Sequence, residues 1–433
     1  MMDEMMLQFI WKHGLFIAQN LRSTHGEKIE ILDQGKHNLN AGPDFTNAKI
    51  RIGNLIWVGN VEIHIRSSDW FKHKHHLDQT YENVVLHVVY QHDKEVAISD
   101  SRNVPVLSLA KMIPKRLIKK YESLIVHSDY PCDNNIDDLS KLHWLNFQER
   151  LVCNRLERKV EEFKRVFSNT QSLEKTLLVL LSKSFGIKIN QLPMMWMMTR
   201  TPLKLIQKKR KSLYDLEAWL FGLSGLLYST RDQYMESLLK RFEVLNQTHQ
   251  IAPLQSTNWK FFRVRKFSYP TLRIAQFAAT IHQVENEMQL DGSNWDFQRI
   301  RNKLKSVQVS EYWRHRYSFQ GGQVEYETRL TDDFIDKLIT NFYLPAKIFI
   351  DQVLGCQSDF DIAAVLETLR FESNKITSRF VSNGMDGKNA WDSIAYLELN
   401  HTYCSQKKCL NCVIGQSVIK SGFNHDSKVE KFS

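Results

Sequence analysis

The sequence predicts an α+β protein in which a small N-terminal mixed sheet, ordered helix, strand, hairpin and strand, is followed by a mostly α-helical body. Runs rich in Ile, Val and Trp gather between residues 28 and 110, as is typical of strands. After Pro131 the apolar residues recur with helical spacing, and further prolines separate the helical patterns. We therefore expect three segments: an α+β domain over 1–130, a helical domain over 131–415 and a disordered tail over 416–433.

The N-terminal elements follow from local spacing. Residues 5–21 can place Phe9, Ile10, Leu15, Phe16 and Leu21 on one helical stripe. Strands are expected at 28–32, 84–90 and 104–110. Two further runs rich in Ile and Val meet at Gly53-Asn54, a two-residue signal for a β-hairpin.

The remainder is helical in pattern. Residues 143–167 form a long amphipathic stretch with a charged outer face. Further helical patterns cover 172–185, 203–228, 231–245, 271–288 and 331–342.

Bulk composition sets limits on partners and location. The 433 residues include 58 Lys+Arg against 48 Asp+Glu, a balance that permits an anionic partner such as nucleic acid without establishing one. No run of about 18 apolar residues suggests a membrane span, and the N-terminus lacks the basic and small-residue regions of a signal peptide. We expect a cytoplasmic protein with no membrane partner.

Residues able to do chemistry concentrate between positions 44 and 87. The segment holds Asp44, Glu62, His64, Asp69, His73, His75, Asp78 and His87. Glu62 and His64 stand two apart on a predicted strand, so their side chains share a face. A carboxylate and an imidazole side by side suit a divalent metal or general acid–base catalysis.

Whether Asp44 joins them depends on register. A strict two-residue turn at Gly53-Asn54 pairs Asp44 with Ile63, which would direct Asp44 away from Glu62. One β-bulge reverses this, and Gly59-Asn60 is the expected place because glycine within a strand often marks a bulge.

A structural role is the alternative for each of these residues. Asp69 can cap a turn or helix, and His87 lies in an apolar strand where it can be a satisfied core histidine.

Three cysteines near the C-terminus form a second candidate site. Cys404, Cys409 and Cys412 make a Cys-x4-Cys-x2-Cys run, and thiolates favour zinc and iron. A fourth ligand would come from Cys132, Cys356 or His401, with Cys132 preferred. The alternative is that they are small buried residues.

A basic and aromatic segment lies at 259–276. Arg263, Arg265 and Arg273 are its candidates for binding nucleic acid, because arginine holds phosphates and aromatic rings stack on bases. The apolar neighbours of Arg263 and Arg265 predict that both are partly buried. The lysine-rich runs at 204–212 and 299–305 are more simply explained as solvated helix faces.

The N-terminal motifs resemble the PD-(D/E)xK nuclease superfamily. Its pattern places Pro-Asp on one hairpin strand and Glu-x-Lys on the next, where this chain has Pro43-Asp44 and Glu62-Ile63-His64. The resemblance implies that Asp44 and Glu62 hold Mg²⁺ or Mn²⁺, with His64 in the lysine position. The run from Ser68 to His76 is also similar to very-short-patch repair endonucleases, which implies that His73, His75 or His87 assists the metal-bound water.

The resemblance extends to the cysteines. Some nucleases of this superfamily carry an iron–sulfur cluster held by one distant and three C-terminal cysteines. The resemblance therefore implies either such a cluster or Zn²⁺ at Cys132, Cys404, Cys409 and Cys412.

The order of motifs along the whole chain resembles a bacterial family catalogued as domain of unknown function 2851. The shared motifs are Gly42–Phe45, Asn47–Ile50, Val61–Trp70, Leu86–Val89, Trp259–Gln276, Tyr312-Trp313 and Tyr403–Gly415. This resemblance covers about residues 7 to 415 and implies no activity.

The leading hypothesis is a divalent-metal-dependent nuclease that cleaves phosphodiester bonds of nucleic acid. One alternative is a non-catalytic nucleic-acid-binding or scaffold protein with a degenerate nuclease-like core. Another is a zinc-dependent hydrolase of a small substrate, which three converging histidines would favour.

Overall fold

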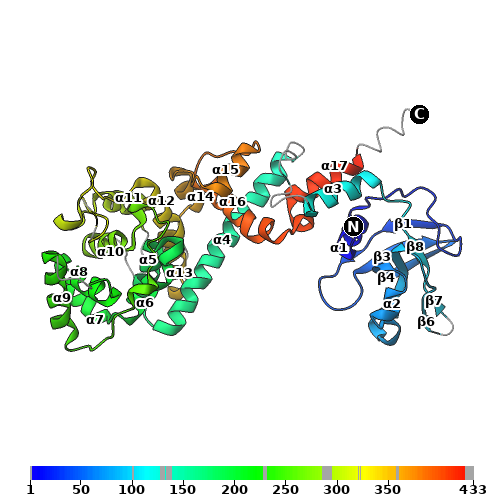
Figure 1. Ribbon diagram of the computed structural model, residues 1–433. Helices are drawn as coiled ribbons and strands as arrows, with labels where there is room; N and C mark the ends of the chain where they lie inside the picture. Colours follow the sequence, from blue (N-terminus) through cyan, green and yellow to red (C-terminus); the bar gives the residue numbers. More distant parts are fainter. Residues whose placement is uncertain are drawn as a thin grey trace. The chain divides into compact units, whose positions relative to one another are not determined.

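The computed structural model describes residues 2–99, 102–126, 132, 139–227, 232–284, 295–319, 321, 323–356 and 360–424 (Figure 1). The chain divides into two compact units. The first, called here the sheet unit, comprises Met1–Glu149, Arg379–Met385 and Leu397–Ser433. The second, the helical unit, comprises Arg150–Ser378 and Asp386–Tyr396. The prediction of an α+β protein with an N-terminal mixed sheet and a mostly helical body is confirmed.

The sheet unit contains both terminal regions of the chain. Its strands are β1 (Ile29–Asp33), β2 (Lys36–His37), β3 (Phe45–Ile52), β4 (Leu55–Arg66), β5 (Val84–Gln91), β6 (Ala97–Ser99), β7 (Arg102–Asn103) and β8 (Val106–Ser108). Its helices are α1 (Glu4–His13), α2 (Asp69–Lys72), α3 (Lys115–Val126) and α17 (Val413–Asn424), with short 3-10 turns η1 (His75–Leu77), η2 (Gln79–Tyr81), η8 (Cys404–Gln406) and η9 (Cys409–Asn411).

The main sheet has the order β1-β3-β4-β5-β8, with β2 added beside β3. Neighbours β1, β3 and β4 are antiparallel, whereas β4, β5 and β8 are parallel. The hairpin predicted at Gly53-Asn54 is confirmed, since Ile52 pairs with Leu55. The helix predicted over 5–21 is too long. It ends at His13 because Gly14 takes a left-handed conformation, φ 61°, and caps the last turn.

The two faces of β4 differ in chemistry although both are buried. Val61 and Ile63 belong to the larger core, which α1, α3 and α17 complete on one face of the sheet. Glu62 and His64 alternate with them and therefore point to the opposite face. That face is packed by a smaller cluster around Trp70 and Tyr81. A strand that buries polar side chains on its second face requires partners for them there.

The helical unit is built from consecutive helices, most of them short. They are α5 (Leu173–Phe185), α6 (Ile187–Arg200), α7 (Leu203–Lys209), α8 (Leu213–Ser224), α9 (Gln233–Asn246), α10 (Pro270–Val284), α11 (Phe297–Ser306), α12 (Asp332–Leu338), η7 (Ile339–Tyr343, a π-helical turn), α13 (Leu344–Leu354) and α14 (Ile362–Thr368). The short 3-10 turns η3 (Ser256–Asn258), η4 (Lys266–Ser268) and η6 (Glu311–Trp313) connect them. The unit boundary falls within α4 (Lys141–Thr170), α15 (Lys375–Ser382) and α16 (Ala390–Thr402).

One helical prediction needs correction, and one helix was not predicted. The single pattern over 203–228 is two helices, α7 and α8, because Ser212 caps a new helix by accepting from the Asp215 N–H. Helix α6 was not predicted, since Pro193 lies inside it and Asn190 interrupts its helical backbone. The predicted helix over 271–288 is present to Val284, and 285–288 lie outside the described residues.

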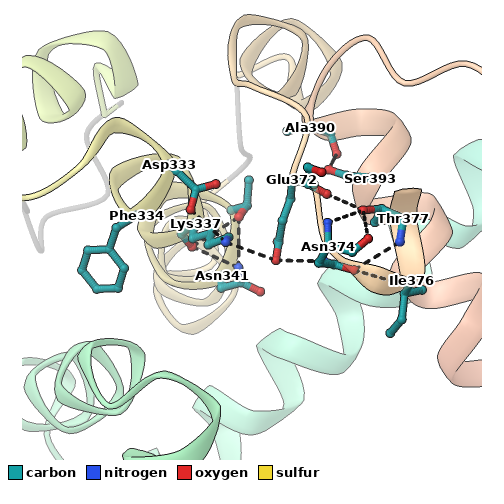
Figure 2. A network of polar contacts seen from close by, with 12 residues as sticks. Asp333, Phe334, Lys337, Asn341, Glu372, Asn374, Ile376, Thr377, Ala390 and Ser393 are labelled. Atoms are coloured by element: carbon teal, nitrogen blue, oxygen red, sulfur yellow. Dashed lines mark hydrogen bonds and ion pairs between the residues drawn. The ribbon is translucent and has the colours of Figure 1, made fainter. Parts of the chain in front are cut away.

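A polar network ties the later helices of this unit together (Figure 2). Lys337 lies 2.9 Å from Asp333 and 3.6 Å from Glu372. Asn374 and Thr377 donate to Glu372, at its side chain and its carbonyl. The enclosed space beside the network is about 10 Å³, which is too small for an organic ligand. We assign it a structural role.

The C-terminal end differs from the expected disordered tail. Residues 416–424 belong to α17, whose Val418 and Ile419 are buried in the core of the sheet unit. The rest of that expected tail, 425–433, lies outside the described residues. Within the described part of the chain, no helix is both long enough and apolar enough to cross a membrane.

Candidate metal centre

Three histidines gather at the polar face of the sheet, and Glu62 lies beside two of them. Glu62 and His64 come from β4, and His73 and His75 come from the turns that follow α2. His64 Nε2 lies 3.1 Å from His73 Nδ1 and 3.5 Å from Glu62 Oε1. His75 Nε2 lies 3.2 Å from the same Glu62 oxygen. Within the described ranges, the three histidines are the one group of three or more potential ligands whose atoms all lie within 4.8 Å of one another.

These separations suit a tetrahedral transition metal. Ligands about 2.0–2.1 Å from a tetrahedral ion stand about 3.3–3.4 Å from one another. The distances around Glu62 and His64 bracket that value. Buried His75 Nε2 also has no hydrogen-bond partner, although it is aimed at Glu62. A buried nitrogen left in this state is what a metal ligand looks like without its ion.

Asp44 reaches the same place through a β-bulge. The β3–β4 register shifts by one residue between Phe45 and Ala48, so Phe45 pairs with Val61 and Asp44 comes opposite Glu62. The extra residue lies on β3, where Asn47 has a φ of 58°. The expected bulge at Gly59-Asn60 is therefore misplaced. Gly59 serves a close approach to β5 instead, since a Cβ there would lie 2.4 Å from Val85 Cγ1.

Asp44 and Glu62 are linked through the backbone. The Asp44 N–H donates to Glu62 Oε2 at 3.1 Å, and the Ile63 N–H donates to Asp44 Oδ2 at 3.0 Å. Gln8 of α1 donates to the other Asp44 oxygen at 2.8 Å. Asp44 therefore holds the end of β3 and the Glu62 carboxylate in fixed positions beside the histidines.

The histidine-bearing turns are held by the Ser-Ser-Asp-Trp motif. Ser68 donates to Asp93 through both its N–H and its hydroxyl, at 2.8 and 2.7 Å, and Ser67 Oγ donates to the same carboxylate. Asp69 accepts the Arg66 N–H at 3.1 Å, which is the capping role considered for it. Asp78 similarly caps η2 by accepting from Thr80. These contacts anchor the chain on either side of His73 and His75.

His87 lies behind His64 and is fully buried. His87 Nε2 is 2.8 Å from His64 Nδ1. His64 Nε2 can bind a metal only if its proton is on Nδ1, which then donates to His87 Nε2. This hydrogen bond makes His87 a positioning residue for His64.

The site holds acidic groups without a compensating cation. Burial, reinforced by the neighbouring Glu62, raises the pKa of Asp44 to about 7. Burial raises the pKa of Glu62 to about 8. Burial lowers the pKa of His87 to about 3 and also lowers that of His64. No lysine or arginine of the described residues forms a salt bridge with Asp44 or Glu62, so a bound metal ion would supply the missing positive charge.

Four residues that contribute to the site were not identified from the sequence, and they are Glu4, Gln8, Trp70 and Tyr81. Gln8 and Glu4 stand four apart on α1; burial raises the pKa of Glu4, and the His73 and His75 imidazoles act against that rise. Tyr81 stacks on His75 with ring centroids 3.8 Å apart, and Trp70 packs against both His75 and His87. The Glu4–Gln8 spacing on α1, whose residues up to Trp11 are otherwise apolar, was the available signal.

The C-terminal cysteines belong to the sheet unit. Cys409 and Cys412 are buried, Cys404 is half-buried, and Cys132 packs beside the core that contains Cys409. Burial raises the pKa of Cys412 to about 11. Across the described residues, the thiols form no group of three within 4.8 Å, the spacing that a mononuclear zinc site needs. An iron–sulfur cluster at these cysteines stays a prediction, tested by iron analysis of protein purified anaerobically.

The exposure of the three candidate nucleic-acid-binding arginines differs from what the sequence predicted. Arg263 and Arg265 are exposed, and not partly buried as expected, because they lie in a loop whose anchor is the buried Trp259. Arg273 is only 6% exposed, donates to Gln276 and lies 3.7 Å from the Phe334 ring centroid. A side chain packed in this way is part of the core and cannot contact a phosphate backbone.

The fold and the site together define an α+β protein with a candidate metal centre of three histidines, two of which lie beside Glu62. A family model described as "Protein of unknown function (DUF2851)" matches residues 4–375, so the chain belongs to this family. The match includes the whole candidate centre and ends before the C-terminal cysteines. No curated protein and no solved structure matches the chain.

The electrostatics predict how the metal-free protein responds to pH. Asp44 and Glu62 have raised pKa values in the folded state, so the folded protein retains protons that the unfolded chain has lost between about pH 4.5 and 8. Stability due to these groups therefore falls as pH rises through that window. The lowered pKa values of His64 and His87 oppose this only below about pH 6.5, where the unfolded histidines become protonated.

We therefore expect chelator-treated protein to lose about 1–2 kcal/mol of unfolding free energy between pH 6.5 and 8. Denaturant unfolding at several pH values measures this loss. Asp44→Asn should flatten the profile because it removes one of the two carboxylates. A wild-type profile already flat over this range would contradict the prediction.

Proposed function

We propose that this protein is a metal-dependent hydrolase of phosphodiester bonds, with its metal held by His64, His73, His75 and Glu62. The observation that carries the proposal is the group of three histidines whose ligand atoms all lie within 4.8 Å of one another, with Glu62 Oε1 at 3.5 and 3.2 Å from two of them. The nuclease-like placement of Asp44 and Glu62 on one hairpin supports nucleic acid as the substrate.

The ligand set favours one kind of ion. Imidazole nitrogens suit zinc and iron, and the Glu62 carboxylate suits manganese, whereas Mg²⁺ takes oxygen ligands almost exclusively. We therefore propose Zn²⁺ or Mn²⁺ rather than the Mg²⁺ that the carboxylates alone would suggest. Such an ion, when bound, would polarise a phosphoryl oxygen and lower the pKa of an attacking water.

The protein's own groups have separate roles in this proposal. The Asp44 N–H orients the Glu62 carboxylate, and His87 holds His64 with its Nε2 free of a proton. Glu4, half-buried on α1 and electrostatically coupled to His73 and His75, is a carboxylate available to accept a proton from water. Exposed His73 marks the side of the centre that a substrate can approach.

A zinc-dependent hydrolase of a small substrate is the second candidate, and the three histidines favour it.

The experiment that decides between the two candidates starts from metal analysis of the purified protein. The metal-free protein is then reloaded with Zn²⁺, Mn²⁺ or Mg²⁺ and given single-stranded and duplex nucleic acid, or small phosphate and carboxylic esters. Cleavage of nucleic acid with Zn²⁺ or Mn²⁺ supports the lead proposal. Cleavage of small esters alone supports the second candidate. A protein that binds no metal, or binds it without hydrolysing anything, would indicate a non-catalytic role.

The role of His87 gives a specific prediction. His87→Phe removes the acceptor for the His64 Nδ1–H, and loss of such an outer partner weakens metal affinity by about 10–100-fold. His87→Gln should restore much of this affinity because its side-chain oxygen can accept the same hydrogen bond. Competition titration with a metal-sensitive dye measures both. Equal weakening by Phe and Gln would mean that His87 serves packing alone.

A further inference from the structure

One surface of the helical unit combines exposed apolar side chains with cations that have no carboxylate partner. We call it the basic–aromatic surface. Its members are Lys188, Ile189, Lys260, Phe262, Arg263, Arg265 and Lys266, all of them exposed. Phe262 is 82% exposed and Ile189 is 54% exposed. A phenylalanine left almost entirely in water is costly unless a partner covers it.

The surface is assembled by a reciprocal contact between α6 and the loop after η3. The Asn190 side chain donates to the Lys260 carbonyl at 3.0 Å and accepts the Lys260 N–H at 2.8 Å. Asn190 is buried and interrupts the α6 helix, which brings exposed Lys188 and Ile189 beside the loop. Trp259 anchors the loop from below by donating to the Ser224 carbonyl at 2.8 Å.

The loop backbone keeps Phe262 and its basic neighbours pointing outward. Arg263 has a left-handed φ of 58°, which reverses the chain immediately after Phe262. Its guanidinium lies 5.2 Å from the Phe262 ring centroid. Lys266 lies 5.3 Å from the Tyr317 ring, and the packed Phe261–Tyr269 pair closes the loop at 5.7 Å. These contacts hold the exposed Phe262 ring beside Arg263 in a loop that is ordered without a ligand.

In the part of the chain that the structure describes, the cations of this surface have no acidic partners, whereas several other cations of the helical unit do. Paired examples are Arg241 with Asp215, Arg301 with Asp336 and Lys347 with Asp351. Among the described residues, no carboxylate forms a salt bridge with any of the five basic members of the surface. Cations without acidic partners, together with an exposed ring that lies beside Arg263, are complementary to a polyanion that also offers flat apolar faces.

We propose that the basic–aromatic surface binds single-stranded nucleic acid, with the cations on phosphates and Phe262 stacked on a base. The faces of bases are accessible in single strands, whereas in a duplex they are covered by stacking. Such binding combines basic side chains that contact phosphates with aromatic rings on which bases stack. The proposal does not depend on the metal centre, since binding at this surface requires no hydrolysis.

The test uses the full-length Glu62→Gln protein with chelator present, so that cleavage plays no part. Fluorescence anisotropy with labelled oligothymidylate and oligouridylate measures affinity over a range of salt concentrations. Phe262→Ala should weaken binding about tenfold, the usual effect of removing one stacked ring. Arg263→Ala combined with Arg265→Ala should reduce the slope of log K against log salt by about 1.4, because each phosphate contact in a single strand contributes about 0.7.

Matched controls lie on other faces of the same unit. Val244→Ala removes an exposed apolar side chain from α9, and Lys303→Ala removes an exposed cation from α11. Both substitutions should leave the affinity and the salt slope unchanged.

A loss of affinity in Phe262→Ala, with either the DNA or the RNA strand, supports the proposal. It is overturned if duplex binds as tightly as single strand, if anionic lipid vesicles bind with the same dependence on Phe262, or if the control variants weaken binding equally. Failure here leaves metal binding at His64 unaffected, so the two proposals are separable.

Discussion

We expect the His64→Ala protein to bind zinc more than about 100-fold more weakly than the wild type. His64 Nε2 is the atom that lies close to both His73 and Glu62, at 3.1 and 3.5 Å, and so occupies the centre of the ligand set. Loss of an outer partner of a metal ligand alone costs about 10–100-fold, and loss of the ligand itself should cost more. Isothermal titration of metal-free protein with Zn²⁺ and Mn²⁺ measures the change directly.

The control is His76→Ala. His76 is exposed, follows His75 in the sequence and packs against Phe71, outside the ligand group. The His76→Ala substitution removes the same kind of side chain from the same turn and should leave metal affinity unchanged.

Ligand binding also stabilises the folded state, by about 4 kcal/mol when the metal is present at about 1,000 times its dissociation constant. The wild type and His76→Ala should therefore gain thermal stability from zinc, and His64→Ala should not. Unchanged zinc affinity in His64→Ala would refute this ligand assignment.

The sheet and part of the site could be predicted because they depend on short-range patterns. The period of two places Glu62 and His64 on one face, and Gly53-Asn54 fixes the hairpin. The alternation Val61-Glu62-Ile63-His64 is the most informative sequence feature of the site. Polar residues alternate there with apolar ones in a strand that is buried on both faces. Sequence alone could not show that both faces are covered.

Other features depend on backbone geometry that residue types do not specify. The bulge that aligns Asp44 with Glu62 uses Asn47, which can adopt a left-handed φ, while Gly59 was the more obvious candidate. The glycine is required for a different reason, the approach of β5 at Val85. One residue of register decides whether Asp44 faces the site, so a correct strand assignment still left this question open.

The burial of the arginines depends on tertiary packing, which local sequence does not specify either. Arg263, Arg265 and Arg273 occur in one basic–aromatic stretch, yet the first two are exposed and the third is buried against Phe334. Their environments depend on α6 and α12, which lie far away in the sequence. Local composition placed the three arginines in one segment but could not show which of them are exposed.

We expect Glu62→Gln to reduce metal-dependent cleavage by about 10³-fold or more in a protein that still folds. Among the described residues, Glu62 is the carboxylate that lies within 3.5 Å of two of the candidate histidine ligands, and an amide cannot supply its negative charge to the ion. Several kcal/mol of transition-state stabilisation by a metal corresponds to about this change in rate. The substitution preserves the size of the side chain, and the oxygen of the new amide can still accept the Asp44 N–H. Single-turnover cleavage of a labelled substrate, at saturating Zn²⁺ or Mn²⁺, separates the chemical step from metal loss.

Glu30→Gln is the matched control, because Glu30 is an exposed carboxylate on β1 of the same sheet, paired with Arg51. Its rate should equal that of the wild type, and binding of single-stranded nucleic acid should be the same in all three proteins, since the cations of the basic–aromatic surface are unchanged. Cleavage by Glu62→Gln at the wild-type rate would show that the reaction takes place elsewhere on the protein.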